Sequence, residues 1–174
     1  IGGILMPGDG AADPSGVTHM LAKGARIHGA QIFEKSPVEE ILTENGKISG
    51  VKVNGHKIDC EYIVLASGMW SRQIGEKAGV SIPLYPAEHF YIITEPIENL
   101  SKTLPVVRDF DNRTYIKEDA GKILVGIFEG NSIPAWDKTN RVPEDFSFGE
   151  FQEKFEHFEP YLASAMKRFP VLET

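Results

Sequence analysis

The chain has 174 residues, of which 41% are hydrophobic and 25% are charged. These fractions are typical of globular domains and exclude a collagen-like, fibrous or disordered protein. Acidic residues outnumber basic residues 25 to 18, which gives a net charge of −7, and the Lys and Arg residues are scattered singly. Nucleic-acid binding and docking on an anionic membrane both need concentrated basic charge, so we expect neither. The longest strongly apolar run, residues 63–66, is too short to cross a bilayer, so we expect no membrane insertion.

The cysteine and histidine content also argues against a disulfide-bonded protein and against a metal-binding protein. Cys60 is the only cysteine, which excludes an internal disulfide framework and a multi-cysteine metal site, and we expect it to be a small buried side chain. The five histidines are dispersed along the chain, so no local zinc motif is present. The chain starts with Ile rather than Met, and we expect it to be a piece of a longer protein.

The first part of the chain is predicted to hold one helix and several short strands. A helix is expected from Pro14 to about Gly29, with Asp13 as its N-cap. Residues 31–34 are predicted to form a short strand. Two Asn-Gly pairs, which are strong hairpin signals, separate three further predicted strands: 38–42, 48–53 and 57–59. Together these three strands are expected to form an antiparallel meander.

Residues 62–66 form a continuous apolar run, which is typical of a strand buried on both faces of a sheet. The run ends in Ser67-Gly68, and a helix is predicted over residues 71–77. Glycine at this turn lets a ligand approach the backbone closely, and free N–H groups at a helix start can face an anion. A plain strand-to-helix turn explains the same pattern.

The second part of the chain is predicted to be richer in strands. Strands are expected in residues 87–95, 106–107, 113–117 and 122–128, with a turn at 119–121, and 131–143 is expected to be an irregular loop. Phe148, Phe151, Phe155 and Phe158 are spaced as one face of an amphipathic helix, and a last helix is predicted over 160–168. This order of elements predicts an α+β fold, with an incomplete nucleotide-binding module joined to a mostly antiparallel second sheet with helices.

Two phosphate-binding motifs are absent. Gly8 and Gly10 begin like the dinucleotide fingerprint G-x-G-x-x-G, but the third position is Asp13. Neither Gly-Lys pair is followed by Ser or Thr, so the chain contains no P-loop.

Five motifs, in this order and spacing, resemble the flavoprotein amine oxidoreductases of the D-amino-acid oxidase superfamily. They are PGDGAADP (7–14), SPV (36–38), ASGMWS (66–71), PLYPAEHFY (83–91) and LPVVRD (104–109). The likeness is greatest to the dimethylglycine and sarcosine dehydrogenase branch and covers about residues 2–130. It implies a central fragment, in which residues 1–82 belong to the FAD-binding domain and 83–174 to an incomplete substrate-binding domain. The family's Gly-rich phosphate turn and the folate-binding region of several relatives have no counterpart here.

The resemblance also implies which residues contact the cofactor FAD. Val38 would hold the adenine through its backbone, and Trp70 would lie beside the flavin. The complete set of cofactor-binding candidates is Val38, Ala66, Gly68 and Trp70.

His89 and Tyr115 would line the amine pocket as catalytic residues. A histidine that titrates near neutral pH can take the proton of the substrate amine, and a tyrosine hydroxyl can orient the substrate. Arg108 is a candidate partner for a substrate carboxylate, because a guanidinium binds carboxylates through two parallel hydrogen bonds.

The implied reaction is the oxidation of a small N-methylated amino acid, of the dimethylglycine or sarcosine type, by hydride transfer to FAD. Two alternatives remain open: a non-catalytic regulatory relative of the same branch, and another oxidase that acts on a D-amino acid or glycerol phosphate. The protein would be cytoplasmic in a bacterium and in the mitochondrial matrix in a eukaryote. The fragment alone is expected to be inactive, to bind FAD weakly and to self-associate through exposed apolar faces.

Overall fold

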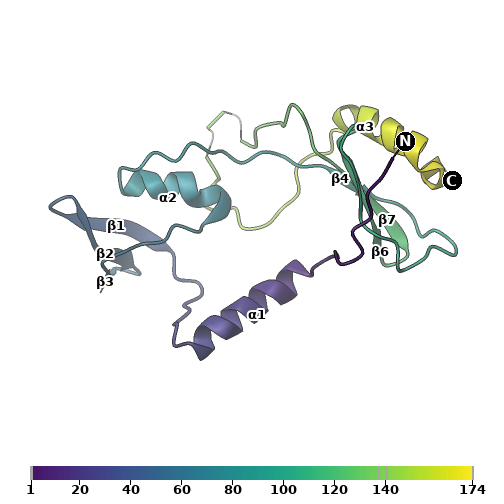
Figure 1. Ribbon diagram of the computed structural model, residues 1–174. Helices are drawn as coiled ribbons and strands as arrows, with labels where there is room; N and C mark the ends of the chain where they lie inside the picture. The colour runs from purple at the N-terminus through teal and green to yellow at the C-terminus, as the bar shows by residue number, and fades with distance from the viewer. Residues whose placement is uncertain (1, 137, 140, 174) are drawn as a thin grey trace. The chain divides into compact units, whose positions relative to one another are not determined.

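A computed structural model describes residues 2–136, 138–139 and 141–173 (Figure 1). The elements in chain order are α1 (Pro14–Ile27), β1 (Val38–Glu44), β2 (Lys47–Val53), β3 (His56–Asp59), η1 (Gly68–Trp70), α2 (Ser71–Lys77), β4 (Tyr91–Ile93), β5 (Val107–Asp109), β6 (Thr114–Asp119), β7 (Lys122–Ile127), α3 (Phe155–Arg168) and η2 (Pro170–Glu173). Residues 1 and 174, at the ends of the two predicted domain segments, lie outside the described residues. So do residues 137 and 140 of the predicted 131–143 loop.

The chain divides into two compact units, each of which is described by itself. Unit 1 comprises Ile1–Pro14, Glu88–Ile133 and Gly149–Thr174, and unit 2 comprises Ser15–Ala87 and Pro134–Phe148. Helices and antiparallel sheets occur in both units, so the fold is α+β, as predicted.

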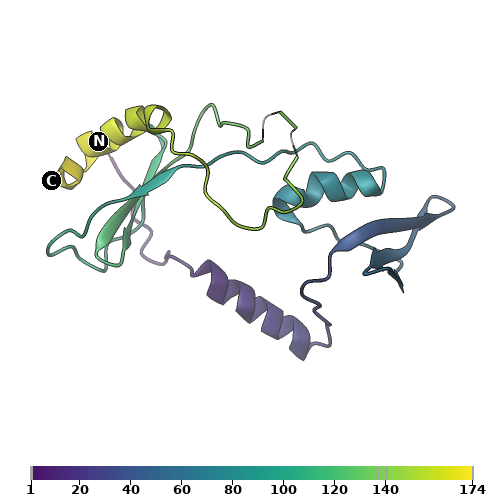
Figure 2. The ribbon, with the colours of Figure 1, turned by 180° about the vertical axis from the view of Figure 1, so that it is seen from behind.

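Unit 2 contains the predicted three-stranded meander, with strand order β1-β2-β3 (Figures 1 and 2). Each Asn-Gly turn has positive φ at both residues: 53° and 75° at Asn45 and Gly46, and 49° and 76° at Asn54 and Gly55. Two left-handed residues in a row match the twist of the flanking strands, which is why this dipeptide closes tight hairpins. The predicted helices α1 and α2 are also present, and Cys60 is a free, partly buried thiol.

Two strands predicted in unit 2 are absent. Residues 31–34 and 62–66 pair with no described strand, and Tyr62 and Val64 are 86% and 89% exposed. An apolar run makes a segment suitable for a buried strand, but a strand also needs neighbours that accept its backbone hydrogen bonds. The described strands of this chain pair only within the sheets β1-β2-β3 and β4-β7-β6-β5. The predicted self-association through residues 62–66 and α1 stays a prediction.

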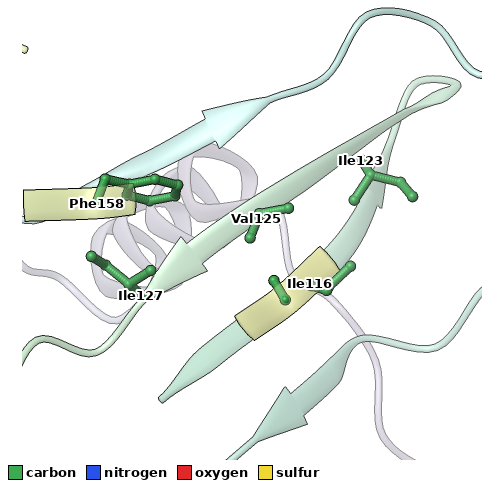
Figure 3. Close-up of a cluster of buried hydrophobic side chains, with 6 residues drawn as sticks. Ile116, Ile123, Val125, Ile127 and Phe158 are labelled. Carbon is green, nitrogen blue, oxygen red and sulfur yellow. The ribbon is translucent and has the colours of Figure 1, made fainter. Parts of the chain in front are cut away.

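Unit 1 is built on an antiparallel sheet of order β4-β7-β6-β5. One face of this sheet carries Ile116, Ile123, Val125 and Ile127, which form the core with Phe158 and Ala165 of α3 (Figure 3). Val125 and Ile127 are fully buried. Because side chains alternate along a strand, the residues between these core positions lie on the opposite face of the sheet.

The helix α3 begins later than the phenylalanine spacing predicts. It starts at Phe155, so Phe148 and Phe151 lie outside it, and Phe148 is 91% exposed. Of the four phenylalanines only Phe158 is buried, so packing against the core stabilises only the later part of the predicted helix. Gly149 between the first two adds a poor helix former. The predicted end at Arg168 is confirmed, but the separate last helix predicted over 160–168 is wrong, because α3 runs continuously through Pro160.

Shortening Ile127 to Ala should destabilise unit 1 strongly. The side chain is fully buried, so the truncation loses apolar burial and leaves a cavity, at a cost of about 2–5 kcal/mol. Urea unfolding followed by circular dichroism measures this difference. The matched control is Ile93→Ala on β4, whose side chain is 46% exposed and should change stability far less. Equal losses of stability in the two variants would contradict the assignment of the core to the sheet face that packs against α3.

Candidate active site

The sheet face opposite the core of unit 1 carries one aligned residue from each strand. Tyr91 of β4 pairs with Gly126 of β7, Gly126 pairs with Tyr115 of β6, and Tyr115 pairs with Arg108 of β5. The register therefore places Tyr115 and Arg108 in one row across the sheet, although sequence reasoning had only placed them on separate strands. We call this surface the open face.

Gly126 makes room for Tyr115. A Cβ atom built on Gly126 would collide with Cζ, Cε1 and the hydroxyl of Tyr115, so the phenol ring lies directly across the backbone of β7. A glycine inside a strand often marks such a close approach. The sequence offered this signal, because Gly126 interrupts the apolar residues 123–127 of β7.

His89 lies between a tyrosine and a carboxylate. Its Nε2 is 3.3 Å from the hydroxyl oxygen of Tyr115, and its Nδ1 is 3.3 Å from Oε2 of Glu129. The rings of His89 and Tyr115 are nearly parallel, with 9° between their planes. The structure thus brings both catalytic candidates into contact, and it adds Glu129, which sequence reasoning missed.

The environment of Tyr115 favours its protonated form. Burial raises the pKa of the phenol above 10.0, and the nearby Glu129 carboxylate and Tyr91 phenol raise that pKa further. At neutral pH Tyr115 therefore keeps its proton and is available as a hydrogen-bond donor as well as an acceptor.

The Phe128 ring contacts Arg108 as well as His89 and Tyr115. The guanidinium carbon of Arg108 lies 4.1 Å from the centre of the Phe128 ring and 5.3 Å from that of Phe110, which are cation–π distances. The Phe128 ring also packs against Tyr115 and His89, with centroid distances of 5.2 and 6.2 Å. Within the described residues Arg108 forms no ion pair. Its cation is therefore positioned by aromatic rings and remains available to an anion.

A cavity of about 260 Å³ lies beside Arg108. Its lining residues are Arg108, Asp109, Phe110, Arg113, Phe128 and Glu129. The lining combines two cations, two carboxylates and two aromatic rings, which suits a small ligand that has charges of both signs and an apolar part. Phe128 could have been found from the alternation of β7, since it lies two residues after Gly126, but no sequence signal marks Glu129 or Arg113.

Asp109 ties this cavity to α3. Its Oδ2 accepts hydrogen bonds from Nε of Arg168 at 2.9 Å and from the side-chain amide of Asn112 at 2.7 Å. The Asn112 bonds, more than the Arg168 cation, lower the pKa of Asp109 below its usual 3.8, while burial opposes the shift. The contact holds β5, which carries Arg108, against the last turn of α3.

The Asp109 contacts predict a loss of stability in acid. A carboxylate whose pKa is lower in the folded state stabilises the fold above its unfolded pKa and loses that contribution as the pH falls through the folded value. Asp109→Asn should therefore cost about 1–3 kcal/mol at pH 7. The deficit should shrink as the pH falls below about 3.8. Urea midpoints at pH 7 and in acid measure this loss of stability.

As a control, Asp119→Asn removes a partner from a surface ion pair with Lys117 and should have little effect on stability. A pH-independent deficit for Asp109→Asn would contradict this account.

The four predicted cofactor contacts all lie in unit 2. Lys77, the last residue of α2, donates hydrogen bonds from Nζ to the carbonyl oxygens of Val38 and Glu39 at 3.1 and 2.8 Å. This contact fixes the start of β1 to the helix that follows the Gly68–Trp70 turn. The two predicted cofactor-binding segments are therefore tied together.

The Gly68 turn fits a ligand that is contacted through the backbone. Gly68 has a left-handed φ of 54° and no atom within 4 Å of the position of a Cβ. Ala66 is exposed and Trp70 is partly buried, so the turn presents backbone with one aromatic side chain to its surroundings. The carbonyl oxygen of Val38 accepts a hydrogen bond from Lys77 and has a second lone pair, so this contact does not prevent a further hydrogen bond.

The described part of the chain holds neither a metal-binding cluster nor a membrane-spanning helix. Its His, Cys, Asp and Glu side chains form no group of three or more that could hold a metal ion. None of its helices is long and apolar enough to cross a membrane.

Comparison with known proteins adds a family match and several relatives. The family model described as "FAD dependent oxidoreductase" matches residues 1–174. The 4-methylaminobutanoate oxidase (formaldehyde-forming) of Paenarthrobacter nicotinovorans is 37% identical over 98% of this chain and 20% of its own length. The mitochondrial pyruvate dehydrogenase phosphatase regulatory subunit of Mus musculus is 34% identical over 100% of this chain and 20% of its own length. The mitochondrial sarcosine dehydrogenase of Homo sapiens is 34% identical over 99% of this chain and 19% of its own length.

A solved structure supports the same relationship. The L-proline dehydrogenase from P. horikoshii superposes with a TM-score of 0.73 and 29% sequence identity, covering 93% of this chain and 40% of that chain. The chain spans about a fifth of the length of the three curated relatives named above.

Proposed function

Because the chain belongs to the DAO family of FAD dependent oxidoreductases, we propose that it is the central part of a flavoprotein that oxidises a small N-methylated amino acid. The substrate would be of the dimethylglycine or sarcosine type. The observation that carries this proposal is the contact of His89 with Tyr115 on the open face, next to the Arg108 guanidinium, which lies over the Phe128 ring. Two relatives named for methylamino acids, 4-methylaminobutanoate oxidase and sarcosine dehydrogenase, support this substrate class.

FAD, when bound, would accept a hydride equivalent from the carbon next to the amine nitrogen. Val38, Ala66, Gly68 and Trp70 are the proposed contacts to it. In this proposal residues 1–82 belong to the FAD-binding domain and 83–174 to the substrate-binding domain. A folate-binding region elsewhere in the whole protein stays a prediction.

The proposed role of His89 and Tyr115 is to remove the proton from the substrate amine. At neutral pH such an amine is protonated, and the hydride leaves readily only when the nitrogen lone pair is free. The amine proton passes to the hydroxyl oxygen of Tyr115 while the Tyr115 proton passes to Nε2 of His89, across the 3.3 Å contact. Tyr115 returns to its neutral form, and His89 carries the charge.

The proposed role of Arg108 is to bind the substrate carboxylate. Its guanidinium lies over the Phe128 ring, which favours one position of this exposed side chain before binding. Phe110 and Phe128 would contact the apolar part of the substrate. A cavity of about 260 Å³ suits a small amino acid.

A second candidate is a non-catalytic regulatory protein. The observation that favours it is the match of a pyruvate dehydrogenase phosphatase regulatory subunit along the whole chain, at 34% identity. A third candidate is an oxidase of the same family that removes the amino group of a D-amino acid or oxidises glycerol phosphate. The presence of both His89 and Tyr115 in contact supports the first candidate over the second.

A substrate panel tests the three candidates. The full-length protein, loaded with FAD, is mixed without oxygen with sarcosine, dimethylglycine, 4-methylaminobutanoate, D-alanine or glycerol phosphate, and flavin absorbance is followed. We expect the N-methylated amino acids to reduce the flavin fastest. Bound flavin that no amine reduces would favour the regulatory candidate, and faster reduction by D-alanine or glycerol phosphate would favour the third.

Where the whole protein resides also stays a prediction. Two of the relatives are mitochondrial by name, which supports the mitochondrial matrix for a eukaryotic source and leaves the cytoplasm for a bacterial one.

A further inference from the structure

Glu129 is a buried carboxylate at the edge of the open face. Its side chain is 3% exposed, whereas that of His89 is 47% exposed. It contacts Nδ1 of His89, the ring nitrogen opposite to the one that faces Tyr115. We infer that Glu129 is a positioning residue, which keeps the hydrogen of neutral His89 on Nδ1 so that Nε2 can accept the proton from Tyr115. This inference rests on the proposed function of His89 and Tyr115.

The geometry fixes which atoms of Glu129 are used. Oε1 accepts the backbone N–H of Phe90 at 3.1 Å, and Oε2 lies 3.3 Å from Nδ1 of His89. Phe90 is the next residue after His89, so the carboxylate is held by the same segment whose side chain it orients. An ionised carboxylate only accepts hydrogen bonds, so the hydrogen of this contact belongs to Nδ1. The lone pair of neutral His89 is then on Nε2, facing Tyr115.

The charged groups around His89 are few. Glu129 and Tyr115 contact its two ring nitrogens, and Phe128 packs against its ring. The neighbouring Glu88 is paired with Lys154. Among the described residues, Tyr91 also faces this cluster, since its phenol helps to raise the pKa of Tyr115. Arg108, Arg113 and the carboxylate of Asp109 line the same cavity as Glu129.

In the proposed proton transfer, Glu129 stabilises the charge that forms on His89. The N–H bond of the amine breaks and an O–H bond forms on Tyr115, while the original Tyr115 O–H bond breaks and an N–H bond forms on Nε2. His89 becomes an imidazolium whose Nδ1–H faces the Glu129 carboxylate, and this pairing stabilises the new charge. Glu129 itself neither gains nor loses a proton.

Glu129→Gln should reverse the tautomer of His89. The glutamine oxygen can still accept the N–H of Phe90, which turns its amide NH2 toward Nδ1 and makes Nδ1 the acceptor. Nε2 then carries the hydrogen and can no longer accept the Tyr115 proton. Nitrogen-15 shifts of labelled histidine in the full-length protein report the tautomer without substrate, and a His89→Ala spectrum identifies the signals. We expect Nδ1–H in the wild type and in Glu129→Asp, and Nε2–H in Glu129→Gln.

The kinetic test uses the pH dependence of flavin reduction by saturating sarcosine. Glu129→Gln should slow reduction about 100-fold at neutral pH. The loss should shrink as the pH approaches the pKa of the substrate amine, because a free amine needs no base. Glu129→Asp, which keeps the charge, should recover part of the rate. The matched control is Glu118→Gln, which also removes a carboxylate that accepts a backbone N–H, from Gly121, in the same sheet. It should leave the pH profile unchanged.

The outcomes separate this inference from the proposed function. An unchanged His89 tautomer in Glu129→Gln, or a rate loss of equal size at every pH, would overturn the role of Glu129. If the wild-type flavin is not reduced by any N-methylated amino acid, the proposed function fails, while the tautomer result still decides the structural part of the inference.

Discussion

Replacing Tyr115 with Phe should slow flavin reduction by about 100-fold or more in the full-length protein, and His89→Ala should have an effect of similar size. Each change breaks the path by which the amine proton reaches Nε2 of His89, across a contact of 3.3 Å. The cofactor should remain bound in both variants, because the proposed FAD contacts lie in unit 2 and these residues lie in unit 1. Stopped-flow absorbance with saturating substrate measures the rate directly.

The control for this prediction is Tyr161→Phe. Tyr161 lies on α3 and its hydroxyl accepts the N–H of Gly130, so the variant also loses one tyrosine hydroxyl from unit 1. Its rate should match that of the wild type. Because His89 and Tyr115 act in the same proton relay, the double variant should be little slower than either single variant. Wild-type rates in both single variants would make the pair structural.

Arg108→Met should raise KM about 10- to 100-fold, since hydrogen bonds between charged groups contribute about 1.5–3 kcal/mol. The maximal rate should change much less, because the guanidinium binds the carboxylate equally before and during hydride transfer. Arg108→Lys keeps the charge but loses the two-pronged geometry, so its KM should be intermediate. Steady-state kinetics measure both parameters.

Lys117→Met is the control for Arg108. It removes a cation from the same sheet, one that already pairs with Asp119, and its KM should stay near the wild-type value. A substrate analogue without a carboxylate should react equally slowly with wild type and Arg108→Met. A clear advantage of the wild type on that analogue would contradict a carboxylate role for Arg108.

Local sequence signals predicted the hairpins and the helices α1 and α2 of this fold well. The Asn-Gly pairs at 45–46 and 54–55 determine their turns by their own conformational preferences, so the meander could be predicted without knowledge of the rest. The run at 62–66 could not be assigned correctly, because a strand depends on partners from elsewhere. The start of α3 also depends on packing, since only Phe158 among the four spaced phenylalanines reaches the core.

The candidate site was predictable only in part. The family resemblance pointed to His89, Tyr115 and Arg108, and strand alternation could have added Phe128. Glu129 could not be found in this way, because it follows β7 and reaches His89 through a contact 40 residues distant in the chain. The cross-strand register that aligns Tyr115 with Arg108 also becomes visible only once the strands are paired.

The most direct test of the central claim is the product of a single turnover. Full-length protein with oxidised FAD is mixed anaerobically with sarcosine, and both reduced flavin and formaldehyde are measured. Oxidation of the N-methyl carbon followed by hydrolysis yields the demethylated amino acid and formaldehyde, so the account predicts one formaldehyde for each flavin reduced. Formation of a 2-oxo acid in place of formaldehyde, or flavin that stays oxidised, would contradict it.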